Sequence, residues 1–186
     1  MKKLVTKILF LAFIAIGCQE NKQPNSDMAK INNSKLSRFE LRCDYNDFKT
    51  KMTELDTIKI SFNHSVCTYE GYERIEITKQ AELIKIKSEF KDIENPEWHL
   101  VYSKNISTTD TIWKFGDFIE RNKAKWTKKG ENRRIIQISN KTDTIKMRTD
   151  GLVELNRFLT DYYSTMKELH PENKNNIYGN DIMVPE

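Results

Sequence analysis

The stretch TIKISFNHSVCTYEGYERIEITKQAELIKIKSEF (residues 57–90) decides the fold of this chain. Ile58, Ile60 and Phe62 fall on one side of an extended backbone, and the polar residues between them fall on the other. The same alternation recurs in three more segments, through Ile75 and Ile77, through Ile84, Ile86 and Phe90, and through Trp98, Leu100 and Tyr102. A period of two is typical of strands with one buried face, and short connections favour an antiparallel meander.

Beyond residue 107 the spacing of apolar residues changes to three and four, which is typical of helices. This spacing predicts a helix over residues 108–125 with Asp110 as its N-cap, although Gly116 weakens it. A hairpin follows over residues 136–147, and a final helix begins at Asp150 and ends at His170, before Pro171. The sequence therefore predicts an α+β fold, an antiparallel sheet (a four-strand meander plus a hairpin) with two helices packed on one face.

The N-terminus has the pattern of a secretory signal, with basic residues at positions 2, 3 and 7 before an apolar run. That run ends in Ile14-Ala15-Ile16-Gly17-Cys18, which resembles the lipobox of bacterial lipoproteins. The resemblance implies cleavage after Gly17, lipidation of Cys18 and attachment to a membrane through the acyl chains. The Lys-, Asn- and Ile-rich composition is loosely similar to lipoproteins of the Bacteroidota, and no domain family is recognised.

The resemblance places the protein in the bacterial cell envelope, and it divides the chain into segments. Residues 1–17 form the signal peptide, 18–36 a polar tether, 37–171 a single α+β domain and 172–186 a polar, loosely attached tail. Gln19 is not the aspartate that marks inner-membrane retention in enterobacterial lipoproteins, which favours the outer membrane. Beyond residue 17 the chain holds 28 basic and 27 acidic residues, so we expect no nucleic-acid partner.

Cys43 and Cys67 are the cysteines that remain besides Cys18. In an oxidising envelope compartment such a pair favours a disulfide. Two other interpretations stay open, namely two separate buried thiols, or a nucleophilic Cys67 activated by the nearby His64. Zinc binding is not expected, because a structural zinc site needs four ligands and the sequence offers no paired motif for them.

Two segments are candidates for contact with a partner protein. The loop over residues 63–74 carries Tyr69, Tyr72 and Arg74, and aromatic residues with arginine are frequent at binding hot spots. A basic segment over residues 121–134 surrounds one tryptophan, and its candidate contacts are Lys125, Trp126, Lys128, Lys129, Arg133 and Arg134. Both segments have an ordinary structural interpretation as well, as a strand connection and as a solvated loop.

The sequence contains no glycine-rich phosphate loop, no Gly-x-Ser-x-Gly motif and no His-Glu-x-x-His motif. We therefore expect a membrane-tethered, non-enzymatic envelope lipoprotein that binds another protein, in an inhibitor, immunity or assembly role, without a cofactor or metal. Two alternatives remain. One is an envelope hydrolase whose residues meet only in space, and the other is a carrier with an internal cavity for a small ligand.

Overall fold

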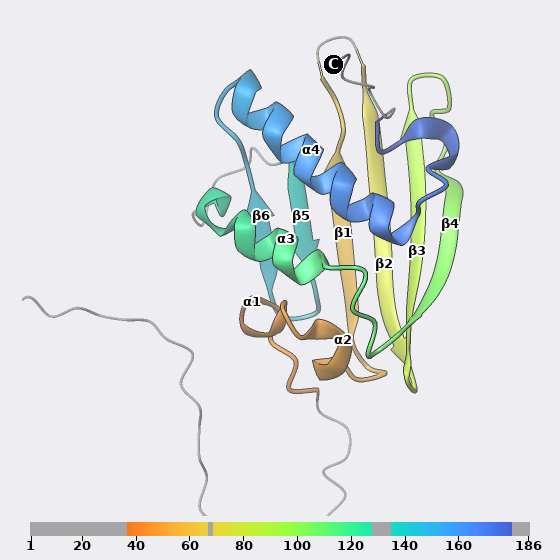
Figure 1. The fold of residues 1–186 in the computed structure, drawn as a ribbon, viewed down its shortest axis with the longest axis vertical. Helices are drawn as coiled ribbons and strands as arrows, with labels where there is room; N and C mark the ends of the chain where they lie inside the picture. The colour runs from red at the N-terminus through yellow and green to blue at the C-terminus, as the bar shows by residue number, and fades with distance from the viewer. Residues whose placement is uncertain (1–36, 67–68, 128–134, 180–186) are drawn as a thin grey trace, which may run out of the picture. The chain divides into compact units, whose positions relative to one another are not determined.

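The computed structural model of the protein describes residues 37–66, 69–127 and 135–179. Figure 1 shows their elements in the order α1 (Leu41–Asp44), α2 (Phe48–Lys51), β1 (Thr57–Asn63), β2 (Gly71–Gln80), β3 (Leu83–Asp92), β4 (His99–Ser107), α3 (Phe115–Arg121), η1 (Lys123–Lys125), β5 (Ile136–Ser139), β6 (Thr144–Met147), α4 (Leu152–Leu169) and η2 (Lys174–Asn176). Within these ranges, no helix combines the length and the apolar character needed to cross a membrane.

The strands form one antiparallel sheet of six, in the order β4-β3-β2-β1-β5-β6. The expected α+β class with an antiparallel sheet is thereby confirmed. The β5–β6 hairpin joins the sheet beside β1, where Ile138 pairs with Ile60. Residues directly opposite in an antiparallel pair share one face, so apolar pairs such as Ile77 and Ile86 build a continuous buried layer.

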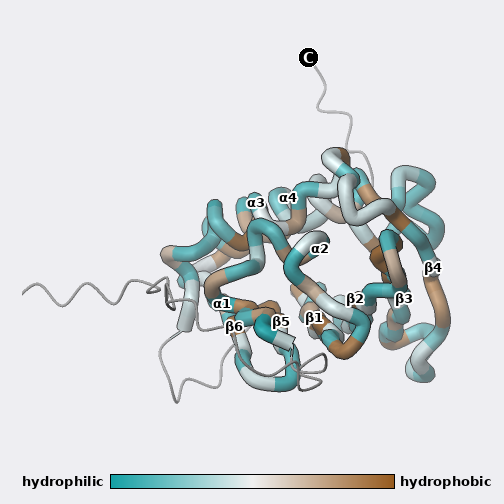
Figure 2. The backbone as a smooth tube through the Cα atoms, turned by 90° about the horizontal axis from the view of Figure 1, so that it is seen from below, coloured by the Kyte–Doolittle hydropathy of each residue, from teal (hydrophilic) through white to brown (hydrophobic). Residues whose placement is uncertain are grey.

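All the described helices lie on one side of this sheet, as the two views in Figures 1 and 2 show. The longest, α4, buries a stripe made of Phe158, Leu159, Tyr162, Thr165, Met166 and Leu169. This helix begins two residues after the predicted start, and its first residue, Leu152, is 74% exposed. The opposite face of the sheet carries no helix of the described residues and is called the open face below.

The helix predicted over residues 108–125 is much shorter, because α3 begins only at Phe115. Asp110 does not cap it. Its carboxylate accepts hydrogen bonds from the Lys49 ammonium at 2.9 Å and from the Trp113 backbone N–H at 3.0 Å, which fixes the turn before α3. Gly116 has a packing reason: a Cβ there would lie 2.8 Å from the Asn46 Cα.

Strand β4 departs from the simple alternation predicted for it. The pairing with β3 shifts register between Ser88, which faces Tyr102, and Glu89, which faces Leu100. Val101 is therefore an extra residue, a β-bulge, which turns the side chains on either side of it to opposite faces. Leu100, predicted to be buried beside Tyr102, is instead 56% exposed on the open face.

Two short helices before β1 complete the described fold, and Cys43 lies in α1. Helix α1 lies near the β5–β6 turn, where Arg42 pairs with Asp143 at 3.0 Å. Cys67 falls outside the described residues, so its predicted disulfide with Cys43 stays a prediction.

The segment after α4, expected to be loosely attached, packs on the core as far as residue 179. Ile177 is 6% exposed and Tyr178 is 1% exposed. The N-terminal signal, Cys18, the tether and residues 180–186 lie outside the described residues, so the predictions for them stay predictions.

Candidate functional site

The open face of the sheet is strongly basic. Eight charged side chains point away from the helices in β1, β2, β3 and β6, namely Lys59, Arg74, Glu76, Lys85, Lys87, Glu89, Lys91 and Lys146. Six are basic and two are acidic, a net charge of +4. The chain beyond position 17 holds 28 basic and 27 acidic residues. Outside the open face it therefore holds 22 basic and 25 acidic residues, a net charge of −3. The open face therefore concentrates positive charge in a chain that is otherwise slightly acidic.

A groove of about 440 Å³, open to solvent, lies on this face. Its lining comes from four adjacent strands and comprises Lys59, Ile60, Ser61, Arg74, Ile75, Glu76, Lys87, Glu89, Gln137 and Ser139. Glu89 sits between two cations, with its carboxylate 2.5 Å from the Arg74 Nε and 2.9 Å from the Lys87 Nζ. Hydrogen bonds from these two side chains lower the pKa of Glu89, so it is ionised at neutral pH and orders the cations around it.

The structure separates the three partner-binding residues predicted in the loop over residues 63–74. Tyr72 and Arg74 lie on the open face, where Tyr72 is 36% exposed. Tyr69 lies on the helix side, because its ring occupies the space into which a Cβ of Gly71 would point. Burial, together with the charges of Asp92 and Glu94, raises the pKa of Tyr69. Two of the three residues therefore share a surface.

Trp98 joins Tyr72 and Arg74 on the open face, although it lies in the loop before β4. The Arg74 guanidinium carbon is 4.4 Å from the centroid of the Trp98 ring, a cation–π contact. The Lys91 ammonium is 5.2 Å from the same ring and 5.7 Å from the ring of Tyr72. These four side chains are called the aromatic–cation cluster below.

The predicted basic segment is described only in part, since Lys128, Lys129, Arg133 and Arg134 fall outside the described residues. Lys125 lies 3.6 Å from a carboxylate oxygen of Glu154 in α4. Trp126 packs edge-on against Tyr45, with ring centroids 5.9 Å apart, and lies under the Arg42 guanidinium at 5.3 Å. In the described part, Lys125 and Trp126 contact the helices rather than the groove.

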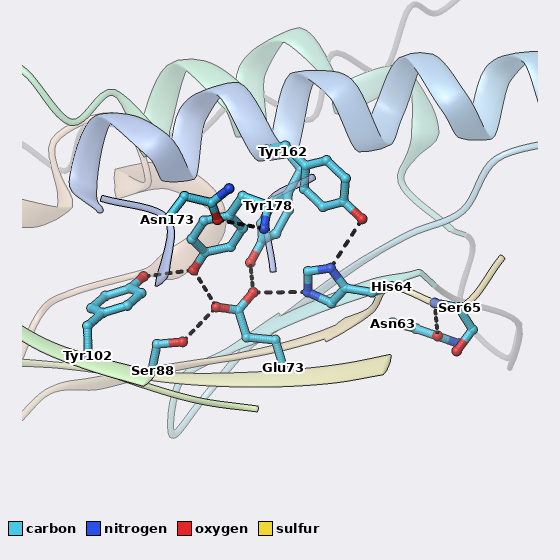
Figure 3. Close-up of polar contacts among 10 residues, drawn as sticks. Asn63, His64, Ser65, Glu73, Ser88, Tyr102, Tyr162, Asn173 and Tyr178 are labelled. Carbon is cyan, nitrogen blue, oxygen red and sulfur yellow. Dashed lines mark hydrogen bonds and ion pairs between the residues drawn. The ribbon is translucent and has the colours of Figure 1, made fainter. Parts of the chain in front are cut away.

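A second cluster of polar side chains lies between the sheet and α4, around the carboxylate of Glu73 (Figure 3). Glu73 is 1% exposed. One of its oxygens accepts hydrogen bonds from the Ser88 hydroxyl at 2.7 Å and the Tyr178 hydroxyl at 2.5 Å. The other accepts from the Tyr162 hydroxyl at 2.8 Å and lies 3.2 Å from the His64 Nε2. Four donors from four segments thus meet on one buried carboxylate.

The electrostatics of this cluster are those of a satisfied structural network. Burial raises the pKa of Glu73, but the hydrogen bonds and the nearby His64 outweigh burial, so the pKa is lowered overall. Burial and the charge of Glu73 raise the pKa of Tyr162 well above its usual value. Because Glu73 is ionised and the tyrosines are neutral, the tyrosine hydroxyls donate to it.

His64 is 1% exposed, as its position at the end of the apolar side of β1 predicts. One ring nitrogen faces Glu73, and the Nδ1 lies 3.3 Å from the Tyr163 hydroxyl. Both nitrogens are therefore engaged, which leaves neither to activate a thiol at Cys67 in this arrangement. Glu73 and its four partners are also absent from the lining of the groove on the open face.

Sequence reasoning singled out Tyr72 and Arg74 of the aromatic–cation cluster. It missed Lys91 and Trp98 there and the network around Glu73, although part of the signal was present. Glu73 has the parity of Ile75 and Ile77, which places a carboxylate on the buried side of β2. The lysines at alternate positions of β3 mark its outward side in the same way. The predicted alternation of Trp98 with Leu100 and Tyr102 on the buried side of a strand is wrong, because β4 begins at His99 and Trp98 lies in the loop before it, against Arg74 and Lys91.

Comparison with protein-family models, with curated proteins and with solved structures finds no significant match. Within residues 37–66, 69–127 and 135–179, no group of three or more histidine, cysteine or acidic side chains could hold a metal ion. The geometry of the open face therefore carries the functional argument.

Proposed function

We propose that this protein is a membrane-tethered, non-enzymatic binding module of the bacterial envelope that docks an acidic protein on the open face of its sheet. The observation that carries the proposal is the charge imbalance between this face, at +4, and the rest of the chain beyond residue 17, at −3. Complementary charge steers a partner into encounter and fixes its orientation, more than it adds affinity.

The composition of the groove supports docking rather than catalysis. Its lining residues include neither histidine nor cysteine, and the carboxylate of Glu89 lies beside two cations that favour its ionised form. A general acid or base working near neutral pH needs a pKa close to the working pH, whereas the pKa of Glu89 is lowered. An open, charged surface with polar groups spread across four strands is suited to contact with another protein.

Charge reversal on the open face tests the proposal. Lys59, Lys85 and Lys146 are changed together to glutamate, and the full-length protein is used to capture proteins from an envelope extract of the native organism. The matched control reverses Lys51, Lys114 and Arg157, which lie on the helix side and give the same change in net charge. We expect the open-face variant to lose at least about tenfold in capture of an acidic protein, since exposed charge pairs contribute up to about 1 kcal/mol each.

The control variant should capture the same protein at the wild-type level, and capture should weaken with added salt because exposed charges are screened. Equal loss in both variants would show a dependence on net charge alone and contradict docking on this face. Preferential capture of a sulfated glycan over any acidic protein would contradict the proposed class of partner.

The tether is tested separately through Cys18. Replacement of Cys18 by alanine should abolish incorporation of labelled palmitate and release the protein from membranes. Continued labelling of the Cys18→Ala variant would contradict lipidation at this residue, and it would leave the docking test unaffected.

A further inference from the structure

The aromatic–cation cluster at one end of the open face has the composition of a binding hot spot, in which Trp, Tyr and Arg predominate. It is formed by Tyr72 and Arg74 of β2, Lys91 of β3 and Trp98. The cation–π contacts hold two long side chains against rings. A partner therefore finds these charges already ordered, and less side-chain entropy is lost on binding.

The cluster also contains a positive charge, on Lys91, that can pair with a carboxylate of a partner. Glu89 pairs with Arg74, whereas no carboxylate of the described residues lies within ion-pair distance of the Lys91 ammonium. Two like charges on one indole ring repel each other, so an incoming carboxylate between them relieves that repulsion. The guanidinium nitrogens of Arg74 not bonded to Glu89 and the ammonium of Lys91 are the donors that such a carboxylate would meet.

Exposed apolar surface adjoins these charges. Leu100 lies opposite Glu89 in the neighbouring strand and is 56% exposed, because the bulge at Val101 turns it outward. Tyr72 is 36% exposed on the other side of the cluster. Removing apolar area from water is favourable, so covering these side chains would add affinity that salt does not screen.

We infer that the cluster is the anchor of the docking face and that it takes a segment of the partner in which an apolar side chain is flanked by carboxylates. The apolar side chain covers Leu100 beside the Trp98 ring, and a flanking carboxylate lies between Arg74 and Lys91. This inference rests on the proposed docking function and specifies the chemistry of the partner.

Two sets of synthetic ten-residue peptides test the anchor. Every peptide carries the same number of Asp and Glu residues, and the sets differ only in a central Phe or Leu versus a central Ser. Binding to the full-length protein is measured by fluorescence anisotropy at low and at physiological salt. We expect the apolar-centred set to bind at least about fivefold more tightly, and we expect this preference to persist as salt rises, because apolar contact is not screened.

Trp98→Ala and Leu100→Ser should remove the preference, while both variants keep the wild-type melting temperature because these side chains lie on the surface. Equal binding of both sets, lost in the Lys59, Lys85 and Lys146 charge-reversal variant, would overturn the anchor and leave the docking face intact. No charge-dependent binding of either set would overturn both the anchor and the docking face. A preference that survives in Trp98→Ala and Leu100→Ser would place the anchor elsewhere and overturn this assignment.

Discussion

Replacing Glu73 by glutamine measures how much the fold depends on its buried carboxylate. Glutamine has nearly the same shape, but it removes the charge and turns one acceptor oxygen into a donor. Each oxygen of Glu73 accepts from two groups, Ser88 and Tyr178 on one and Tyr162 and His64 on the other. Whichever way the amide points, two buried donors lose their acceptor.

The magnitude follows from these contacts. A buried donor left without a partner costs roughly 1–3 kcal/mol, so two of them cost roughly 2–6 kcal/mol. Rotation of the hydroxyls and the removal of a buried charge recover part of this. We therefore expect Glu73→Gln to lower the free energy of unfolding by about 3 kcal/mol, a large fraction of the roughly 5–15 kcal/mol of a typical domain.

Equilibrium unfolding in urea at pH 7, followed by circular dichroism, measures the change by linear extrapolation. Glu76→Gln is the matched control, because Glu76 lies on the same strand, is exposed on the open face and undergoes the same chemical change. The control should shift the unfolding free energy by less than about 0.5 kcal/mol. A Glu73→Gln variant within about 0.5 kcal/mol of wild type, with an unchanged slope, would refute the reasoning, as happens where a buried polar network contributes no net stability.

The pH dependence of the free energy of unfolding, compared between wild type and Glu73→Gln, provides an independent check. The pKa of Glu73 is lower in the folded protein than its usual value of 4.5, so the unfolded state binds its proton more tightly. The stability contributed by the ionised form is present above that usual value, and it is lost as the pH falls toward the folded pKa. The difference between wild type and Glu73→Gln should therefore shrink below about pH 4.5.

Two further changes test other parts of the fold. Burial lowers the pKa of His170 below its usual 6.5, so stability is lost as the pH falls below that value. The His170→Phe variant keeps a ring stacked on Tyr102 and should flatten the decline in the free energy of unfolding between pH 7 and 5. An unchanged slope would contradict this role of His170. The Gly116→Ala variant should lower the free energy of unfolding in urea by about 1–2 kcal/mol, because the strain of overpacking outweighs a gain in helix propensity of about 1 kcal/mol. A stabilised variant would show that the backbone at Asn46 moves away easily.

The strands were predictable because alternation is a local property of the sequence. The buried side of β1 can be predicted from Ile58, Ile60 and Phe62 without knowing which elements cover it. The bulge at Val101 was not predictable, since an extra residue in one strand is defined only by its pairing with β3. Helices α1 and α2 span four residues each, which is too short for a helical period to appear.

The two clusters show the same division between local and non-local information. The parity of Glu73 marks a buried carboxylate, but its donor Tyr178 lies 105 residues further along the chain. Trp98 reaches the open face from a loop, and only the folded chain shows that it covers Arg74 and Lys91. Tyr69 and Tyr72 are three positions apart in the segment predicted as one loop, yet they lie on opposite sides of the sheet, with Tyr72 in β2.

The distance in sequence between Glu73 and Tyr178 also delays the formation of their hydrogen bond during synthesis of the chain. At roughly 5–20 residues per second, the ribosome needs about 5–20 seconds to extend the chain from one to the other. During that interval, closing the sheet over Glu73 would trap an ionised carboxylate without the hydroxyls of Tyr162 and Tyr178. The complete network around Glu73 can therefore form only after residue 178 has been made, which would suit the proposed export of the chain before it folds.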